Sequence, residues 1–258
     1  MAPTTGVPDH QYLIHYGENI RSIRQLLRRT EMTQREGVPI DSSSSKYQIV
    51  SKAFNKMPLC PGYQTNGYAT VKGIISTATT YNYNFSNLTY LTYFSNAFLC
   101  YRGSTHWSFD VDWAGSPLAH VRAYKNPNGG GLAAMYTNSY AYTTQNSLSN
   151  MVNNLNNSGA SGQALVDQRV QPGVNVSAPN YSRAKFQSCD PAYANQGIVK
   201  DGSNADAFYI EVHSPTPSTT NTGACIVTSY VSAGTDYGLY FFLNAPMLFS
   251  YSSVPTPT

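Results

Sequence analysis

The chain has 258 residues, of which 41% are hydrophobic and 13% aromatic, enough to bury the core of one large β-domain. Charged residues make up only 11% of the chain, well below the usual quarter, and the net charge is +3. So small a charge argues against tight nucleic-acid binding by a single copy, since such binding usually takes about six to ten cationic contacts. Low charge together with 21 tyrosines favours either a surface covered by partner proteins or a secreted protein with a neutral Ser/Thr/Asn surface.

The positive charge is confined to the N-terminal part of the chain. Residues 1–60 contain eight Lys or Arg and five acidic residues, so they carry the whole net charge, and residues 61–258 are neutral. We predict that residues 1–60 form an N-terminal arm, that 61–249 form the β-domain and that 250–258 form an extended tail.

The four cysteines, Cys60, Cys100, Cys189 and Cys225, are widely spaced and contain no C-x-x-C pair, so no zinc site is predicted. The first residues lack the apolar core of a signal peptide, which favours an intracellularly made protein with free thiols. No apolar run is long enough to span a membrane. We predict no metal and no cofactor.

Within the arm, residues 1–15 contain two prolines without periodicity and are expected to be extended, whereas residues 16–29 predict a short helix. Apolar residues recur on one side of it, and four arginines lie elsewhere on its surface. The apolar stripe is Ile20, Ile23, Leu26 and Leu27; the arginines are Arg21, Arg24, Arg28 and Arg29. A helix this short is marginal in water, so it needs a surface to pack on.

Three roles are open for this basic helix. It docks under the β-domain of its own or a neighbouring subunit, it presents its arginines to RNA while docked, or it lies on a membrane surface. The third ranks last, because the helix lacks Trp and Phe. The arm is expected to be needed for assembly and not for folding of the β-domain.

From residue 62 onward the chain is rich in β-forming residues. We expect strands within 68–77, 99–113, 118–125, 174–186, 205–215 and 225–246, a short helix near 88–98, and loops at 126–131 and 146–163. Seven or eight strands without alternating long helices favour an all-β sandwich.

Signals for catalysis are poor: the sequence has no G-x-S-x-G, H-E-x-x-H or P-loop motif. Asp110 and Asp112 alternate along a predicted strand and could form a glycosidase pair, but outward-facing polar residues are the simpler interpretation. His106 is either a base or a packed histidine. The main rival to an assembly protein is a secreted lectin-like sandwich that binds carbohydrate through Trp107 and Trp113.

Four stretches, taken in order, resemble one family. They are GENIRSIRQLLRR (17–29), FLCYRGSTHWSFDV (98–111), VNVSAPNYSRAKF (174–186) and SAGTDYGLYFFLNAPMLF (232–249). Together they are similar to segments of a major capsid protein of insect picorna-like viruses, the iflaviruses and dicistroviruses.

The resemblance implies an eight-stranded jelly-roll β-sandwich, with the arm and its basic helix inside a pseudo-T=3 icosahedral shell. It implies a structural protein of the virion, not an enzyme, made in the host cytoplasm. The implied partners are two other capsid proteins and a small internal one, sixty copies of each, and the viral positive-strand RNA through non-specific contacts. The helical opening points to the subunit around the fivefold axis. The host receptor stays unassigned.

One departure from the family concerns an acidic motif. Relatives carry Asp-Asp-Phe before the last strand, a motif implicated in self-cleavage of the precursor of the small capsid protein. Here the matching residues are Gly234, Thr235, Asp236 and Tyr237, so only Asp236 remains. Without its acidic neighbour, Asp236 is predicted to be a structural residue that holds a turn through bonds to backbone N–H groups, and no residue is assigned a catalytic role.

Overall fold

The computed structural model describes residues 20–40, 46–64, 67–72, 79–113, 120–125, 135–141, 145, 149, 162–180, 185–190, 207–213, 223–246, 248 and 255. Nine of its strands build the main body of the molecule. They are β1 (Glu31–Ile40), β2 (Lys46–Asn55), β7 (Thr105–Trp113), β8 (His120–Lys125), β9 (Tyr136–Ala141), β10 (Gln163–Asp167), β11 (Gly173–Ala178), β13 (Ala207–His213) and β14 (Gly223–Ala233).

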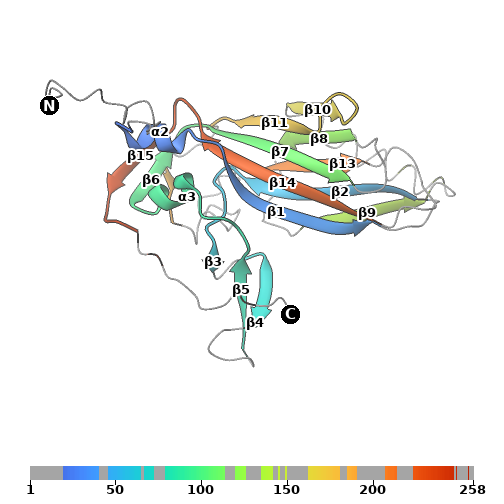
Figure 1. Ribbon diagram of the computed structural model, residues 1–258, viewed down its shortest axis with the longest axis horizontal. Helices are drawn as coiled ribbons and strands as arrows, with labels where there is room; N and C mark the ends of the chain where they lie inside the picture. The colour runs from blue at the N-terminus through green and yellow to red at the C-terminus, as the bar shows by residue number, and fades with distance from the viewer. Residues whose placement is uncertain are drawn as a thin grey trace, which may run out of the picture.

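These strands form two antiparallel sheets that face each other as two layers (Figure 1). One sheet has the order β1-β14-β7-β11, and the other has the order β10-β8-β13-β2-β9. Along the chain, β1, β7, β11 and β14 belong to the first sheet, and β2, β8, β10 and β13 to the second. Eight strands that cross between two sheets in this way form a jelly roll, as predicted. The ninth strand, β9, extends the second sheet beside β2.

The core between the sheets follows from alternation along the strands. In β7, Trp107, Phe109, Val111 and Trp113 are buried, while the residues between them are partly or fully exposed. Side chains of a strand point alternately to the two faces, so this sequence places one face against the second sheet. The aromatic rings of Phe54 and Phe109 meet edge to face with centroids 4.8 Å apart, which joins the two layers.

The predicted domain boundary at residue 60 is wrong. Strand β1 pairs with β14 along its whole length, and β2 lies between β13 and β9, so both belong to the sandwich. The sandwich therefore begins at Glu31, and within the described residues only 20–30 remain of the arm. The prediction failed because the basic residues of β1 and β2 were assigned to the arm by charge, although the charge of Lys52 is buried inside the sandwich.

Smaller elements connect and flank the two layers. A helix was expected near 88–98, and the structure has α3 (Tyr90–Ser95), capped by Thr89. The expected strand over 99–113 is divided at Gly103 into β6 (Phe98–Arg102) and β7. Two further sheets are β12-β6-β15, with β12 (Gln187–Ser188) and β15 (Gly238–Phe242), and β3-β5-β4, with β3 (Gly62–Tyr63), β4 (Ala69–Lys72) and β5 (Thr80–Asn84).

Candidate assembly surface

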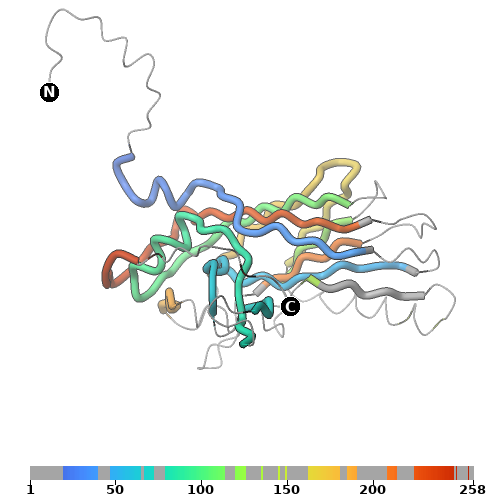
Figure 2. The backbone as a smooth tube through the Cα atoms, turned by 60° about the horizontal axis from the view of Figure 1, so that its bottom comes forward, coloured from blue at the N-terminus to red at the C-terminus, as the bar shows by residue number. Residues whose placement is uncertain are grey.

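One end of the sandwich gathers the arm helix, α3, β6 and β15, as both backbone views show (Figures 1 and 2). The arm helix is α2 (Ile23–Leu27), which is shorter than the predicted 16–29; the residues before Ile20 lie outside the described part of the chain. Ser22 caps the helix, because its hydroxyl accepts a hydrogen bond from the N–H of Arg24.

The apolar stripe of this helix is divided between two environments. Leu27 is 6% exposed and belongs to the hydrophobic core, and Leu26 is half-buried. Ile20 and Ile23 are each 46% exposed. The stripe is therefore docked on the chain's own sandwich at its C-terminal end and remains open at its N-terminal end.

All four arginines of the stretch are exposed. The guanidinium of Arg28 bonds to the sandwich: its Nη2 donates to the carbonyl oxygen of Thr235 at 3.3 Å. This bond joins the end of the arm helix to the turn between β14 and β15. Arg21 lies just before the helix and Arg24 lies in it, and both are exposed.

The same turn is held against the β6–β7 turn by Asp236. Its carboxylate accepts hydrogen bonds from the N–H of Ser104 at 2.9 Å and from the Ser104 hydroxyl. The Ser104 carbonyl accepts from the N–H of Gly234 at 2.8 Å. A Cβ atom on Gly103, whose φ is +118°, would lie 2.4 Å from the Asp236 carbonyl oxygen, so two turns this close require glycine. The Ser104 hydrogen bonds lower the pKa of Asp236 below its usual value.

The neighbouring Tyr237 anchors this turn in the core. It is 2% exposed, its ring stacks on Tyr101 at a centroid distance of 5.8 Å, and its hydroxyl lies 3.2 Å from that of Ser95 in α3. Burial raises the pKa of Tyr237 well above its usual value, so it stays neutral. Asp236 and Tyr237 thus fix the β14–β15 turn from the outside and the inside.

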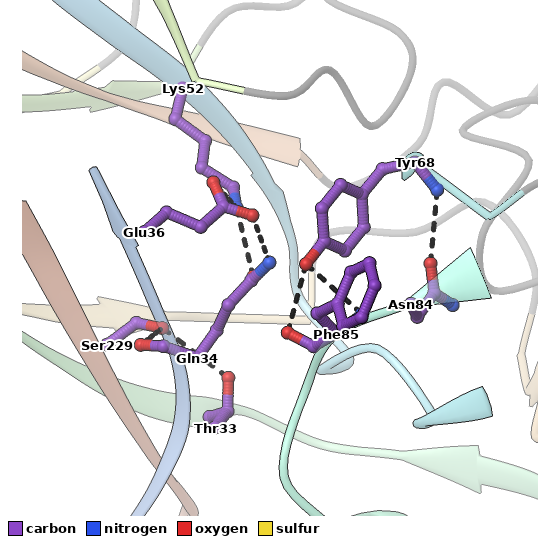
Figure 3. A network of polar contacts seen from close by, with 8 residues as sticks. All are labelled: Thr33, Gln34, Glu36, Lys52, Tyr68, Asn84, Phe85 and Ser229. Atoms are coloured by element: carbon purple, nitrogen blue, oxygen red, sulfur yellow. Dashed lines mark hydrogen bonds and ion pairs between the residues drawn. The ribbon is translucent and has the colours of Figure 1, made fainter. Parts of the chain in front are cut away.

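A buried polar network that sequence reasoning missed joins the two sheets (Figure 3). Lys52 of β2 forms an ion pair with Glu36 of β1 at 2.5 Å, and its ammonium donates to Gln34 at 2.9 Å. Burial lowers the pKa of Lys52, and the charge of Glu36 offsets only part of this effect. Burial likewise raises the pKa of the nearby Tyr68 to about 12, with the Glu36 charge adding to the shift. Both charged residues occupy inward-facing strand positions, but the sequence does not show that they face each other.

A second network missed from the sequence lies on β13. Glu211 accepts a hydrogen bond from the Tyr124 hydroxyl at 2.7 Å and lies 3.2 Å from Nε2 of His213, whose Nδ1 is 3.0 Å from the Tyr47 hydroxyl. Burial raises the pKa of Glu211, but the hydrogen bonds with His213 and Tyr124 outweigh it, so the pKa lies below its usual value. Tyr47, Tyr124, Glu211 and His213 all belong to strands of the second sheet, so the network supports that sheet.

The tryptophans and the aspartates that were considered for carbohydrate chemistry lie on opposite faces of β7. Trp107 and Trp113 are 3% and 7% exposed and point into the core, so neither offers a sugar-stacking face. Asp110 and Asp112 lie on the opposite face of the same strand and are exposed. His106 is also exposed on that face, next to a shallow hollow that includes Asn175 and Ser232.

In the part of the chain that the structure describes, no group of three or more His, Cys, Asp or Glu residues could hold a metal ion. The four cysteines are unpaired, and burial raises the pKa values of Cys189 and Cys225 to about 12. Among these same described residues, no helix has the length and apolarity needed to cross a membrane.

No protein-family model and no curated protein matches the sequence. Solved virus structures match the fold over nearly the whole chain. A chain in the structure of a marine algae virus of the order Picornavirales is 22% identical, with a TM-score of 0.77, and the match covers 97% of this chain and 91% of that one. A chain of black queen cell virus is 15% identical, with a TM-score of 0.52 and coverages of 99% and 88%. A chain of the Triatoma virus empty capsid is 18% identical, with a TM-score of 0.50 and coverages of 93% and 87%.

The likeness extends beyond the nine strands of the sandwich, because the match covers 97% of the chain. It also supports the resemblance noted in the sequence, since the insect-virus chains have the same fold. The chain has the jelly-roll fold of the capsid proteins of picorna-like viruses.

Proposed function

We propose that this chain is a structural protein of an icosahedral viral capsid that encloses a positive-strand RNA genome. The observation that carries the proposal is the match of 97% of the chain to a Picornavirales virus chain at a TM-score of 0.77. The location of the chain is then the virion, its role is structural, and no catalytic step is assigned to it.

The distribution of charge and apolar surface supports this role. The chain is only 11% charged, and large apolar side chains remain exposed before and on α2 and on β15, among them Ile20, Ile23 and Phe242. Exposed apolar patches of this kind mark protein interfaces. A shell subunit covers such surfaces with its neighbours, whereas an isolated secreted protein leaves them in water.

The finer assembly is part of the same proposal. The shell is pseudo-T=3 and contains sixty copies each of this chain, two other capsid proteins and a small internal one, with this chain around the fivefold axes. The arm helix faces the interior, where Arg21 and Arg24 neutralise RNA phosphates without reading sequence. Ile20 and Ile23 contact a neighbouring subunit, while Leu27 holds the helix on its own sandwich.

The test is to co-express this chain with the other capsid proteins of its genome and to examine the product by electron microscopy and sedimentation. Uniform icosahedral particles that contain this chain in a one-to-one ratio with the other major proteins are expected. The matched control omits this chain. Particles that form equally well without it, or a monomeric chain that binds glycans, would refute the proposal and favour the lectin-like alternative.

A further inference from the structure

The sheet β12-β6-β15 ends in an edge strand with an uncovered aromatic surface. Strand β15 pairs with β6 on one side, and no described strand pairs with its other side. Around it lies a group that we name the β15 patch, which consists of Phe98, Phe186, Tyr240, Phe241, Phe242 and Leu243.

The aromatic members of the patch contact one another. Phe98 and Phe186 are partly buried, and the four residues from Tyr240 to Leu243 are exposed. Phe242 and Phe98 meet edge to face at 5.4 Å, and Phe186 lies 4.8 Å from Tyr240 and 5.9 Å from Phe241. Phe241 and Phe242 are nevertheless 60% and 67% exposed. Phe241 has a φ of +60°, an uncommon value for a bulky residue, and it is the residue left out of the pairing register with β6.

The form of the patch indicates what covers it. An edge strand presents unpaired N–H and C=O groups, and the partner that satisfies them is an extended chain. Residues 238–248 of this chain contain no charged residue. The partner segment that lies against them is therefore expected to present apolar side chains. Tyr240, Phe241 and Phe242 are 40%, 60% and 67% exposed, and an aromatic side chain buries about 150–250 Å² when it is fully covered. The exposed parts of these three side chains therefore offer about a third to a half of the roughly 800 Å² that one side of a standard interface contributes. This area suits a segment rather than a whole domain.

The charges at the border of the patch are positive. Lys185 is exposed and lies over the Phe186 ring at 5.9 Å, and Arg102, also exposed, pairs with Gly238 at the start of β15. The carboxylate of the nearby Asp236 keeps its negative charge but is turned toward Ser104 of the β6–β7 turn. Electrostatic complementarity therefore favours a segment with an acidic residue beside its apolar run.

We propose that an extended, apolar segment of a neighbouring capsid subunit, bearing an acidic residue, adds as a strand to β15 and covers the β15 patch. This inference rests on the proposed capsid function and names the surface through which the chain joins its neighbour. It gives the exposed aromatic residues a role that the fold of a single chain does not require.

The experiment compares particle yield for co-expressed capsid proteins that carry substitutions in this chain. Phe241→Ser with Phe242→Ser is expected to lower particle yield at least tenfold, while the thermal midpoint of the isolated chain changes little, because both side chains are mostly exposed. The matched control is Leu165→Ser with Val170→Ser, two apolar residues that are 65% and 84% exposed outside the patch. The control is expected to assemble like the unsubstituted chain. Lys185→Glu is expected to weaken assembly, and unchanged assembly would overturn the acidic feature of the partner.

Two further measurements identify the occupant. Amides of residues 238–243 are expected to exchange hydrogen at least tenfold more slowly in particles than in the isolated chain. A photo-crosslinking benzoylphenylalanine at position 242 is expected to label an extended apolar segment of another subunit. Normal particles from the double-serine variant, equal exchange rates, or labelling of RNA would each overturn the inference and leave the capsid function intact. Absence of particles from the unsubstituted chain would instead count against the capsid function itself.

Discussion

The carboxylate of Asp236, in the β14–β15 turn, accepts two hydrogen bonds from Ser104, in the closely packed β6–β7 turn. The bonded N–H belongs to the backbone, so the contact fixes the path of the chain as well as the side chain. The turn that Asp236 holds also accepts the hydrogen bond of Arg28 from the arm helix. One carboxylate thus stabilises the place where the arm, β6–β7 and β14–β15 meet.

Removing this acceptor is predicted to have a small, pH-dependent effect. Asp236→Ala loses both bonds and is expected to lower the free energy of unfolding by about 0.5–1.5 kcal/mol at pH 7. Asp236→Asn keeps an acceptor oxygen and is expected to change it by less than about 0.5 kcal/mol. The pKa of Asp236 is lowered on folding, so its ionised form adds stability above the ordinary value of 3.8, and this contribution is lost as the pH falls toward the folded pKa. Urea unfolding at pH 7 and pH 3 measures the difference.

Asp236→Asn is also expected to leave any precursor cleavage intact, because the carboxylate is engaged in the turn. Electrophoresis of assembled particles measures this. Particles that stall with an uncleaved precursor in this variant, while unfolding remains normal, would contradict the structural role and assign catalysis to Asp236.

The buried ion pair of Lys52 and Glu36 predicts an asymmetry between single and double substitutions. Glu36→Gln leaves a buried ammonium without its counter-charge and is expected to cost about 3–5 kcal/mol of unfolding free energy. Lys52→Met with Glu36→Leu removes both charges and is expected to be far less costly. Chemical denaturation of both variants tests this, and equal destabilisation by the two would show that the pairing contributes little.

The lowered pKa of Lys52 also predicts the direction in which the free energy of unfolding changes with rising pH. Between its folded pKa and the ordinary value of 10.5, the unfolded state binds more protons than the folded state. Stability contributed by this residue therefore rises with pH through that range. The rise is expected to be absent in Lys52→Met, which serves as the control for other titrating groups.

The arm helix is predicted to respond differently at its two ends. Leu27→Ala creates a cavity in the core and is expected to cost about 2–5 kcal/mol in the isolated chain. Ile23→Ala, at an exposed position, is expected to change the stability of the isolated chain by less than about 0.5 kcal/mol but to lower particle stability. Thermal unfolding of the isolated chain and of the assembled particles measures these effects. If Ile23→Ala particles are as heat-stable as unsubstituted ones, Ile23 is not an interface residue.

The arginines are predicted to act together in packaging RNA. Replacing Arg21, Arg24 and Arg28 by Gln is expected to reduce the RNA content of particles, read from the ratio of absorbance at 260 and 280 nm, while empty shells still form. Arg28→Gln alone serves as a control, because it removes the Arg28 bond to Thr235 but only one of the three positive charges. Unchanged RNA content in the triple variant would show that these arginines contact protein only and do not bind RNA.

The sequence by itself determined the all-β character of the chain and the positions of several elements. The strand expected over 99–113 covers β6 and β7, and the helix expected near 88–98 contains α3, because the β-forming and helix-forming residues of each element lie next to one another in the chain. The resemblance over four stretches predicted the jelly roll. Asp236 is predicted to be a turn residue because its acidic neighbour in the family motif is missing, and its carboxylate accepts hydrogen bonds from Ser104.

Only the tertiary structure decided where the arm ends and which charges are buried. Lys52 and Glu36 looked like parts of a basic arm, but strand pairing places them face to face between two sheets, where each neutralises the other. The helix stripe looked uniform, yet packing buries Leu27 and leaves Ile23 exposed. Burial and pairing depend on contacts between residues far apart in the chain, such as Ser104 with Asp236, and local sequence patterns do not encode which distant segments meet.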